Sequence, residues 1–291
     1  MNNRVTQIGS YAFAGCANLT TASFLNVTTI NGNAFAGCAN LTTASFPNVT
    51  TIKGSAFMDC FKLTTASFPN VTTIDTNTFY HCTNLTTISF PNVTKISNSA
   101  FAGCSSLTTV SFPNAITIGN SAFFQCANLT TISFPNATTI SGNAFSGCTS
   151  LTTVSFPNVT TIERSAFSSC TNLTTVSFPN ATTISSSAFF QCSKLTTISF
   201  PNAMVIGTLA FQKCLKLLSL YLLGSVIVTL MGSNAFTSTP IGGYTDSTDG
   251  VYGSVFVPQS LLTAYQSATN WTLISSRIVG LTESEIEELN E

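Results

Sequence analysis

The sequence carries very little charge. Only 7% of its 291 residues are Asp, Glu, Lys or Arg, whereas an ordinary globular protein has roughly 25%. The formal net charge is −1, so the chain lacks the positive excess that indicates nucleic-acid binding. Surface polarity must therefore come from Thr, Ser and Asn.

Residues that perform chemistry are also scarce. His81 is the only histidine, and a catalytic triad needs a nucleophile and an acid placed around such a residue. No two of the ten cysteines stand at the short spacing that zinc sites use. The sequence shows no Gly-rich phosphate loop and no paired-carboxylate site. It therefore predicts a protein that is not an enzyme, with no catalytic residues, no metal site and no cofactor.

Long apolar segments are missing too. No apolar run follows residues 1–4, so no signal peptide is visible. The apolar stretch 217–231 is shorter than the roughly 20 residues of a membrane helix and contains Gly224 and Ser225, so no membrane insertion is predicted. The repeat described below starts in mid-unit at Val5. We therefore expect the N-terminal cap and any export signal to lie in sequence that precedes this chain.

What the sequence has in abundance is a repeat of 22 residues. Leucine recurs at this interval from Leu19 to Leu217, and phenylalanine does so from Phe13 to Phe211. The cysteines keep the same interval and stand at Cys16, Cys38, Cys60, Cys82, Cys104, Cys126, Cys148, Cys170, Cys192 and Cys214. Such a regular period over ten units predicts a solenoid that grows by adding rungs.

One half of the unit predicts a strand. Residues 85–90 read L-x-x-I-x-F, which is the strand signature of a leucine-rich repeat. Because side chains alternate along a strand, Leu85, Ile88 and Phe90 should point inward, while Thr87 and Ser89 point outward. Each rung is thus apolar on one side and must bury that side against its neighbours, about 4.8 Å away.

The other half of the unit predicts a second wall. Pro91 ends the strand because it has no N–H to donate. Asn92 follows it in the sequence, and its equivalents should form a hydrogen-bonded ladder between rungs. Val93 and Ile96 open a second inward-facing segment, and Cys104 completes the rung.

The repeat resembles the BspA-like leucine-rich repeat family, whose rungs read V-x-x-I-x-x-x-A-F-x-x-C-x-x-L-x-x-I-x-F-P. The match covers roughly residues 5–222, and residues 255–258, 262–265, 271 and 277–279 are similar to the C-terminal region of bacterial members. The resemblance implies a right-handed leucine-rich repeat solenoid with one parallel β-sheet, mostly β and coil. It also implies a secreted or bacterial cell-surface protein that adheres to host matrix proteins, other cells or glycans.

The period also divides the chain. The predicted parts are a solenoid over residues 1–223, an irregular last rung with a C-terminal cap over residues 224–280, and an acidic tail over residues 281–291. In the cap, Pro258 should start a helix that reaches about Ala268, and Trp271 should seal the end of the core. Thr282 and Glu285 could form a capping box, but the tail has few apolar residues and is predicted to be frayed.

The cysteines admit two interpretations. Stacked rungs would place equivalent cysteines about 5 Å apart, within reach of a disulfide. Their side chains would point in the same direction, however, which disfavours the dihedral angle near 90° that a disulfide requires. We therefore predict free thiols that act as small buried hydrophobes. Disulfide pairing is the alternative, because exported proteins usually oxidise their cysteines.

The departures from the repeat supply a candidate binding site. Eight of them fall in two adjacent units: Lys53, Met58, Asp59, Phe61, Lys62, Asp75, Tyr80 and His81. Phe124 and Phe190 replace small residues at a corresponding place. Aromatic residues mixed with charges are typical of interfaces. We predict that a partner contacts Phe61, Tyr80, His81, Phe124 and Phe190, with sequence drift in tolerant loops as the alternative.

The outward face of the strands is a second candidate surface. Thr and Ser recur there in every rung, for example at Thr87, Ser89, Thr109 and Ser111. Such an array could bind a partner, or it could simply be solvated, since threonine suits strands. A regular threonine lattice also resembles ice-binding solenoids.

Three functions follow, in decreasing order of support. The first is a non-enzymatic surface or secreted binding module whose partner is a host matrix protein, a cell-surface protein or a glycan. The second is a passive spacer in a larger surface protein. The third is an ice-binding threonine array.

Overall fold

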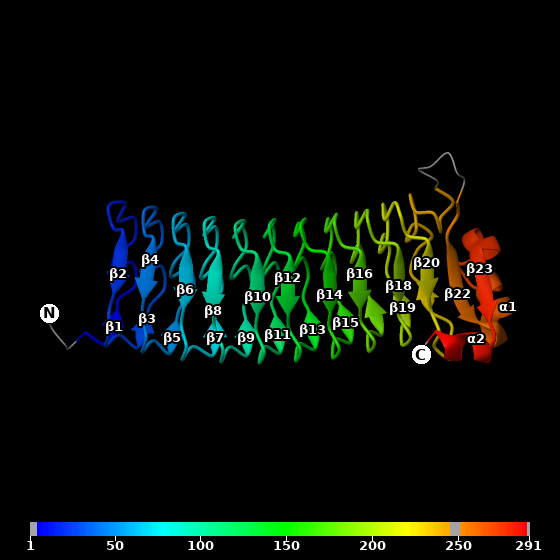
Figure 1. The fold of residues 1–291 in the computed structure, drawn as a ribbon, viewed down its shortest axis with the longest axis horizontal. Coiled ribbons are helices and arrows are strands. Elements are labelled where there is room, and N and C mark those ends of the chain that lie inside the picture. Colours follow the sequence, from blue (N-terminus) through cyan, green and yellow to red (C-terminus); the bar gives the residue numbers. More distant parts are fainter. Residues whose placement is uncertain (1–4, 245–250, 290–291) are drawn as a thin grey trace. The chain divides into compact units, whose positions relative to one another are not determined.

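The chain forms two compact units, each built from the predicted repeat. The computed structural model describes residues 5–244 and 251–289, and the units are Met1–Leu151 and Thr152–Glu291. Within each unit, a regular rung has one three-residue strand and one two-residue strand joined by turns (Figure 1). This confirms the predicted solenoid architecture, in which strand and coil predominate.

The N-terminal unit holds two rows of strands. Its three-residue strands are β2 (Thr21–Ser23), β4 (Thr43–Ser45), β6 (Thr65–Ser67), β8 (Thr87–Ser89), β10 (Thr109–Ser111) and β12 (Thr131–Ser133). Its two-residue strands are β1 (Gln7–Ile8), β3 (Thr29–Ile30), β5 (Thr51–Ile52), β7 (Thr73–Ile74), β9 (Lys95–Ile96), β11 (Thr117–Ile118) and β13 (Thr139–Ile140). The two-residue row coincides with the segment predicted only as a second inward-facing wall, so short parallel strands form on both walls of a rung.

The C-terminal unit continues both patterns and then departs from them. Its three-residue strands are β14 (Thr153–Ser155), β16 (Thr175–Ser177), β18 (Thr197–Ser199) and β20 (Ser219–Tyr221), and its two-residue strands are β15 (Thr161–Ile162), β17 (Thr183–Ile184), β19 (Val205–Ile206) and β21 (Thr229–Leu230). The longer strands β22 (Ser254–Pro258) and β23 (Ile278–Leu281) extend the sheet in the order β18-β20-β22-β23.

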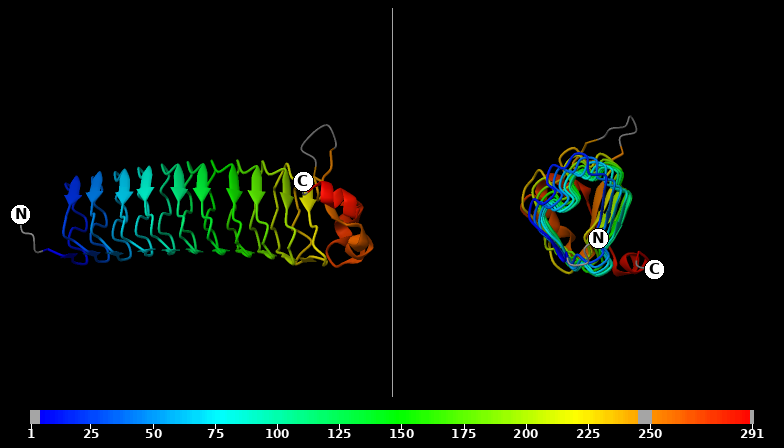
Figure 2. Two further views of the ribbon diagram at one scale, coloured as in Figure 1. Left: turned by 60° about the horizontal axis from the view of Figure 1, so that its bottom comes forward. Right: turned by 90° about the vertical axis from the view of Figure 1, so that its left-hand side faces the viewer.

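Strand pairing places equivalent positions of successive rungs side by side. Thr109 of β10 lies beside Thr131 of β12, and Val110 lies beside Ile132, in a parallel ladder. Along β10, Thr109 and Ser111 are exposed whereas Val110 is buried, as the alternation predicts. Seen along the stacking direction in the right-hand view of Figure 2, the rungs of the N-terminal unit, coloured blue to green, follow nearly the same path.

Two columns of phenylalanine fill the N-terminal core. Along the column Phe13, Phe35, Phe57, Phe79, Phe101, Phe123 and Phe145, successive rings stack with centroids 5.1–5.4 Å apart. Along the column Phe24, Phe46, Phe68, Phe90, Phe112 and Phe134, the spacing is 5.5–6.2 Å. Rings of the two columns meet at steep angles, for example 67° between Phe90 and Phe101. This tilted packing is a favourable aromatic geometry. The rings are buried from Phe35 onward, whereas Phe13 and Phe24 of the first rung are partly exposed.

Two polar ladders run along the outside of the rungs. The side-chain amide of Asn92 donates to the carbonyl oxygen of Pro69 at 2.7 Å, and its equivalents bond in the same way along the N-terminal unit. The predicted asparagine ladder is therefore confirmed. Threonine hydroxyls form a second ladder, in which Thr86 donates to the carbonyl of Thr64 at 3.2 Å. The asparagine amides thus give the carbonyls of the Pro residues a side-chain donor. The threonine hydroxyls add a second donor to carbonyls that already accept a backbone N–H, since the Thr86 N–H also donates to the carbonyl of Thr64 at 3.0 Å.

The C-terminal end of the array is closed by aromatic side chains. Trp271 and Tyr265 are completely buried, and their rings meet edge to face at 5.2 Å. The Trp271 ring also packs 6.0 Å from Phe236, the last ring of the column Phe167, Phe189, Phe211 and Phe236. Trp271 thus occupies the place predicted for it, at the end of the core.

Short helices surround this closure. Pro258 immediately precedes the 3-10 helix η1 (Gln259–Leu261) and the helix α1 (Leu262–Ser267), close to the predicted bounds. A second 3-10 helix, η2 (Thr272–Arg277), leads into β23.

The prediction of a frayed tail was wrong for the described part of residues 281–291. These residues form the helix α2 (Glu283–Glu288), which begins with a complete capping box between Thr282 and Glu285. The cap satisfies N–H groups at the start of the helix, and the two acidic residues in its first turn suit the positive end of the helix dipole.

Candidate functional site

The main departures from the repeat gather on one edge of the N-terminal unit. They lie in the turns that lead from a two-residue strand to the next three-residue strand. We call Asp59, Phe61, Tyr80 and His81 the Tyr80 cluster. Its members come from two consecutive rungs, and Asp59 and His81 occupy equivalent positions in them. Stacking of the rungs therefore brings these two side chains together.

The Tyr80 cluster combines charge with exposed aromatic surface. Nδ1 of His81 lies 3.5 Å from Oδ1 of Asp59, and the two side chains are 45% and 31% exposed. The imidazole stacks on the ring of Tyr80 with a centroid distance of 4.0 Å. Phe61 is 43% exposed. The cluster thus offers a carboxylate, an imidazole and aromatic rings at one place on an otherwise uniform surface.

The side chains of Asp59 and His81 both start from an unusual backbone conformation. Asp59 and His81 each have a φ of 57°, in the left-handed region, where neighbouring rungs have Gly37 and Gly103. Side chains with a Cβ adopt this region at a cost of roughly 1–2 kcal/mol. The conformation persists because the N–H of His81 donates to the carbonyl of Ala102 at 2.8 Å, and Asp59 does the same to Tyr80.

Gly103 makes room for the imidazole. A Cβ at Gly103 would collide with Cδ2 of His81, so no larger residue fits in this rung while the imidazole keeps its place. The same relation recurs more loosely at Gly147, where a Cβ would lie 3.2 Å from Cγ of Gln125. In these two cases, a larger residue in one rung leans over a glycine in the next.

The remaining aromatic candidates do not all join this cluster. Phe124 lies two rungs after Tyr80 and is half-buried, and the intervening Ala102 is only 2% exposed. Phe190 belongs to the C-terminal unit, where Nζ of Lys213 lies 5.5 Å from the centroid of its ring. The structure therefore brings Phe61, Tyr80 and His81 to one edge and places Phe190 in the other unit.

The threonine and serine candidates lie on the strands as predicted. Thr87 and Ser89 are exposed on β8, and Thr109 and Ser111 are exposed on β10. Their neighbours on the same face are again Thr and Ser, because pairing joins equivalent residues. This face presents hydroxyl groups but no charged or aromatic side chain that would select one protein partner.

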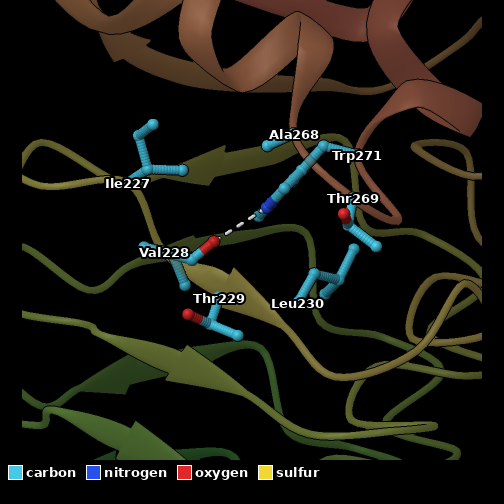
Figure 3. Close-up of a pocket in the computed structure, with 7 residues that line it drawn as sticks. All are labelled: Ile227, Val228, Thr229, Leu230, Ala268, Thr269 and Trp271. Atoms are coloured by element: carbon cyan, nitrogen blue, oxygen red, sulfur yellow. Dashed lines mark hydrogen bonds between the residues drawn. The ribbon is translucent and has the colours of Figure 1, made fainter.

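A hollow of about 280 Å³ lies at the end of the C-terminal unit (Figure 3). It lies between the segment Ile227–Leu230 and the segment that carries Ala268, Thr269 and Trp271. Nε1 of Trp271 donates to the carbonyl oxygen of Val228 at 2.8 Å, as the dashed line in Figure 3 marks. The Tyr265 hydroxyl accepts from the Val228 N–H at 3.0 Å. The polar groups of Trp271 and Tyr265 thus form hydrogen bonds with the backbone of Val228. The hollow is therefore part of the structure that closes the end of the core.

The sequence of this chain matches one family model over most of its length. The model describes a BspA type leucine rich repeat region, and it matches residues 6–126 and 116–241. The chain belongs to the BspA-type leucine-rich repeat family. No curated protein sequence matches it.

Several solved structures resemble this BspA-type chain. A leucine-rich cell surface protein from Faecalibacterium prausnitzii is 25% identical, with 96% of this chain and 81% of that protein covered and a TM-score of 0.52. A leucine-rich repeat protein from Bacteroides ovatus shares 18% identity over 97% and 82% of the two chains, with a TM-score of 0.65. The pneumococcal vaccine antigen PcpA shares 16% identity over 95% and 83%, with a TM-score of 0.52. The last two likenesses show the fold alone.

The cysteines of the BspA-type repeat are structural. None of the ten, all of which lie in the described part of the chain, forms a disulfide, and all except the exposed Cys16 are buried. The Sγ of Cys126 donates to the carbonyl of Phe101 at 3.2 Å, and burial raises the pKa of this thiol from its ordinary value near 9 to about 12. A thiol held in its neutral form is a poor nucleophile and a poor metal ligand. Among the described residues, no group of three or more His, Cys, Asp or Glu side chains could hold a metal ion.

The described helices of this chain are short. No helix in the described part of this BspA-type chain is long and apolar enough to span a bilayer.

Sequence reasoning missed one member of the cluster, Asp59, and the glycine beside the cluster, Gly103. Asp59 was recognised as a departure from the repeat but was not among the predicted contact residues, and Gly103 was not considered. Their signal is the period itself, because Asp59, His81 and Gly103 are each separated by 22 residues. Reading the repeat as columns rather than as single rungs would have placed them side by side.

The fit between His81 and Gly103 predicts a specific pattern of stability. Gly103→Ala should destabilise the protein more than Gly37→Ala, because both glycines have positive φ but only Gly103 faces an imidazole. The difference should be about 1–3 kcal/mol, as expected for overpacking. In a double variant that carries both Gly103→Ala and His81→Ala, most of this difference should disappear. Urea unfolding of the unchanged protein, Gly37→Ala, Gly103→Ala and the double variant would measure it. Equal effects at Gly37 and Gly103 would contradict the proposed fit.

The buried thiols predict a loss of stability in alkali. Above pH 9 an unfolded thiol releases its proton, whereas the buried Cys126 thiol keeps it until about pH 12. The native state therefore binds more protons over this range, and its stability falls by about 1.4 kcal/mol per pH unit for each such thiol. Urea unfolding at pH 8, 9.5 and 11 under reducing conditions would show the decline. The slope should be smaller in Cys126→Ala, and an unchanged slope would refute the assignment.

Proposed function

We propose that this BspA-type protein is a non-enzymatic binding module, secreted or displayed at a cell surface, that adheres to a protein of the host matrix or of another cell. The observation that carries the proposal is the Tyr80 cluster. It concentrates aromatic rings and a contact between an imidazole and a carboxylate in a chain that has only 7% charged residues. The likeness to a bacterial cell surface protein at 25% identity supports the location.

The composition of the cluster suits a protein partner. Tyrosine and other aromatic residues contribute strongly to protein interfaces, because a rigid ring buries a large area with little loss of conformational entropy. The stacking of Tyr80 on His81 already fixes both rings at 4.0 Å, so binding would order few side chains. The adjacent carboxylate of Asp59 adds a directional acceptor, which favours one partner over others.

The surrounding architecture also suits a binding role. The cluster rests on rungs whose phenylalanine core is fully buried, with Phe57, Phe79 and Phe101 each at 0% exposure. Sites held on a rigid support lose less free energy on binding than mobile ones.

The test is binding of the purified protein to a panel of extracellular-matrix proteins by surface plasmon resonance. Tyr80→Ala/His81→Ala should weaken saturable binding at least tenfold, since loss of a central aromatic residue typically costs 2 kcal/mol or more. The matched control is Phe190→Ala/Gln191→Ala, which changes an aromatic residue and its polar neighbour at the same positions of a rung in the C-terminal unit.

The other possible results of this experiment would indicate a different binding site or a different function. A loss only in the control variant would move the site to the C-terminal unit. Binding retained in both variants would move it away from these turns, for example to the Thr and Ser face. No saturable binding to any member of the panel would favour a passive spacer.

A further inference from the structure

The outward face of the C-terminal sheet changes character at β20. In β16 and β18 the last outward residue is a serine, and Ser199 lies in register with Tyr221 of β20. Tyr221 is in register with Phe256 of β22, and Phe256 with Val279 of β23. A row of hydroxyl groups thus ends at Tyr221, Phe256 and Val279, which lie in register on the neighbouring strands β20, β22 and β23. Figure 1 shows these strands side by side.

The rings of Tyr221 and Phe256 stack on each other on the outward face of the sheet. Their centroids are 4.7 Å apart and their planes differ by 14°. Coplanar rings could not approach this closely without overlap, so the rings stack face to face along the direction in which the strands succeed one another. One face of Tyr221 therefore covers Phe256, and its other face points toward the Ser199 side.

The adjacent strand β18 carries no side chain large enough to cover the outer face of Tyr221. A serine side chain is too short to cover a six-membered ring, and Thr197 and Ser199 are themselves exposed on β18. Leu218, which stands where earlier rungs have threonine, adds a second exposed apolar side chain at 38%. We call the row of outward Thr and Ser side chains on β14, β16 and β18 the floor. We call the boundary between this floor and the ring of Tyr221 the aromatic step.

Closure of the core does not explain these aromatic residues. The inward side chains of the same strands, Leu220 and Val255, are completely buried and already complete the core. Tyr221 and Phe256 point to the other side, where they remain partly exposed. Tyr252 is also exposed, and the guanidinium of Arg277 lies 3.7 Å from its ring centroid.

We infer that this step binds a neutral oligosaccharide, with one sugar ring against the outer face of Tyr221. The C–H groups of a pyranose carry partial positive charge and match the negative face of an aromatic ring. The sugar hydroxyls match the Thr197 and Ser199 hydroxyls, each of which can both donate and accept. The outward residues of β14, β16 and β18 are all Thr or Ser, so the floor offers no charge for an acidic or basic ligand.

The inference is tested by calorimetric titration of the full chain with maltohexaose, cellohexaose, mannohexaose and, as a charged comparison, a heparin hexasaccharide. We expect saturable binding to at least one neutral hexasaccharide. Tyr221→Ser should weaken it at least tenfold while leaving the fold intact, because serine is the residue that earlier rungs carry at this position. Phe256→Ser, which removes the support behind the ring, should have a smaller effect. Thermal unfolding would verify that both variants fold.

The control is Tyr80→Ala/His81→Ala, which should bind the oligosaccharide as the unchanged protein does. This separates the inference from the proposed function, since either site could fail alone. Binding only to the heparin hexasaccharide, or neutral binding that Tyr221→Ser leaves intact, would overturn it. The inference would also be overturned if none of the neutral hexasaccharides bound. The same holds if Tyr221→Ser lost binding to matrix proteins but kept binding to the hexasaccharide.

Discussion

Each rung of this protein can bury its apolar side chains only against copies of the same side chains in the next rung. This constraint explains the regular columns of phenylalanine, whose rings repeat at 5.1–5.4 Å in the N-terminal unit. It also explains the neutral thiols, since Cys126 fills a small buried space and donates to the carbonyl of Phe101. A change at one core position would misfit two neighbours at once, so the core positions scarcely vary.

The same constraint determines where function can reside. Core and ladder positions are occupied by packing and hydrogen bonding, and no buried side-chain N or O atom of the described residues lacks a partner. Variation is tolerated only in the turns and on the outward face. The departures there are few, and the two largest form distinct surfaces, the Tyr80 cluster in the N-terminal unit and the aromatic step at Tyr221 in the C-terminal unit. Each surface adds aromatic rings where other rungs have small residues.

Much of the fold could be predicted from the sequence because period and packing are linked directly. The interval of 22 residues predicted the rungs, the alternation predicted that Thr87 and Ser89 are exposed, and the asparagine after proline predicted the ladder. The pairing of the second wall was missed, because a strand such as Lys95–Ile96 is too short to leave an alternation pattern. The helix α2 was missed since its capping box was weighed against an acidic, apolar-poor tail.

The sites were harder to predict than the fold. Phe61, Tyr80 and His81 were recognised from composition, but the contact between His81 and Asp59 depends on the stacking of two rungs. Tyr221 stands where earlier rungs have serine, but its partner Phe256 follows 35 residues later in an irregular part of the chain. No fixed interval relates the two. Such a pair becomes visible only when the strand order is known.

The central claim is that the rungs are interchangeable packing units, and removal of one rung tests it most directly. Deletion of residues 105–126, one full period, joins Cys104 to Ala127 and recreates the sequence found at residues 37–41. The shortened protein should unfold cooperatively in urea, with a stability that reflects the loss of one rung. Deletion of residues 105–125 removes one residue fewer, so it leaves one extra residue in the rung at the junction and should disrupt the register between this rung and the preceding one. Equal stability of the two deletion variants, or failure of the full-period deletion to fold, would contradict the account.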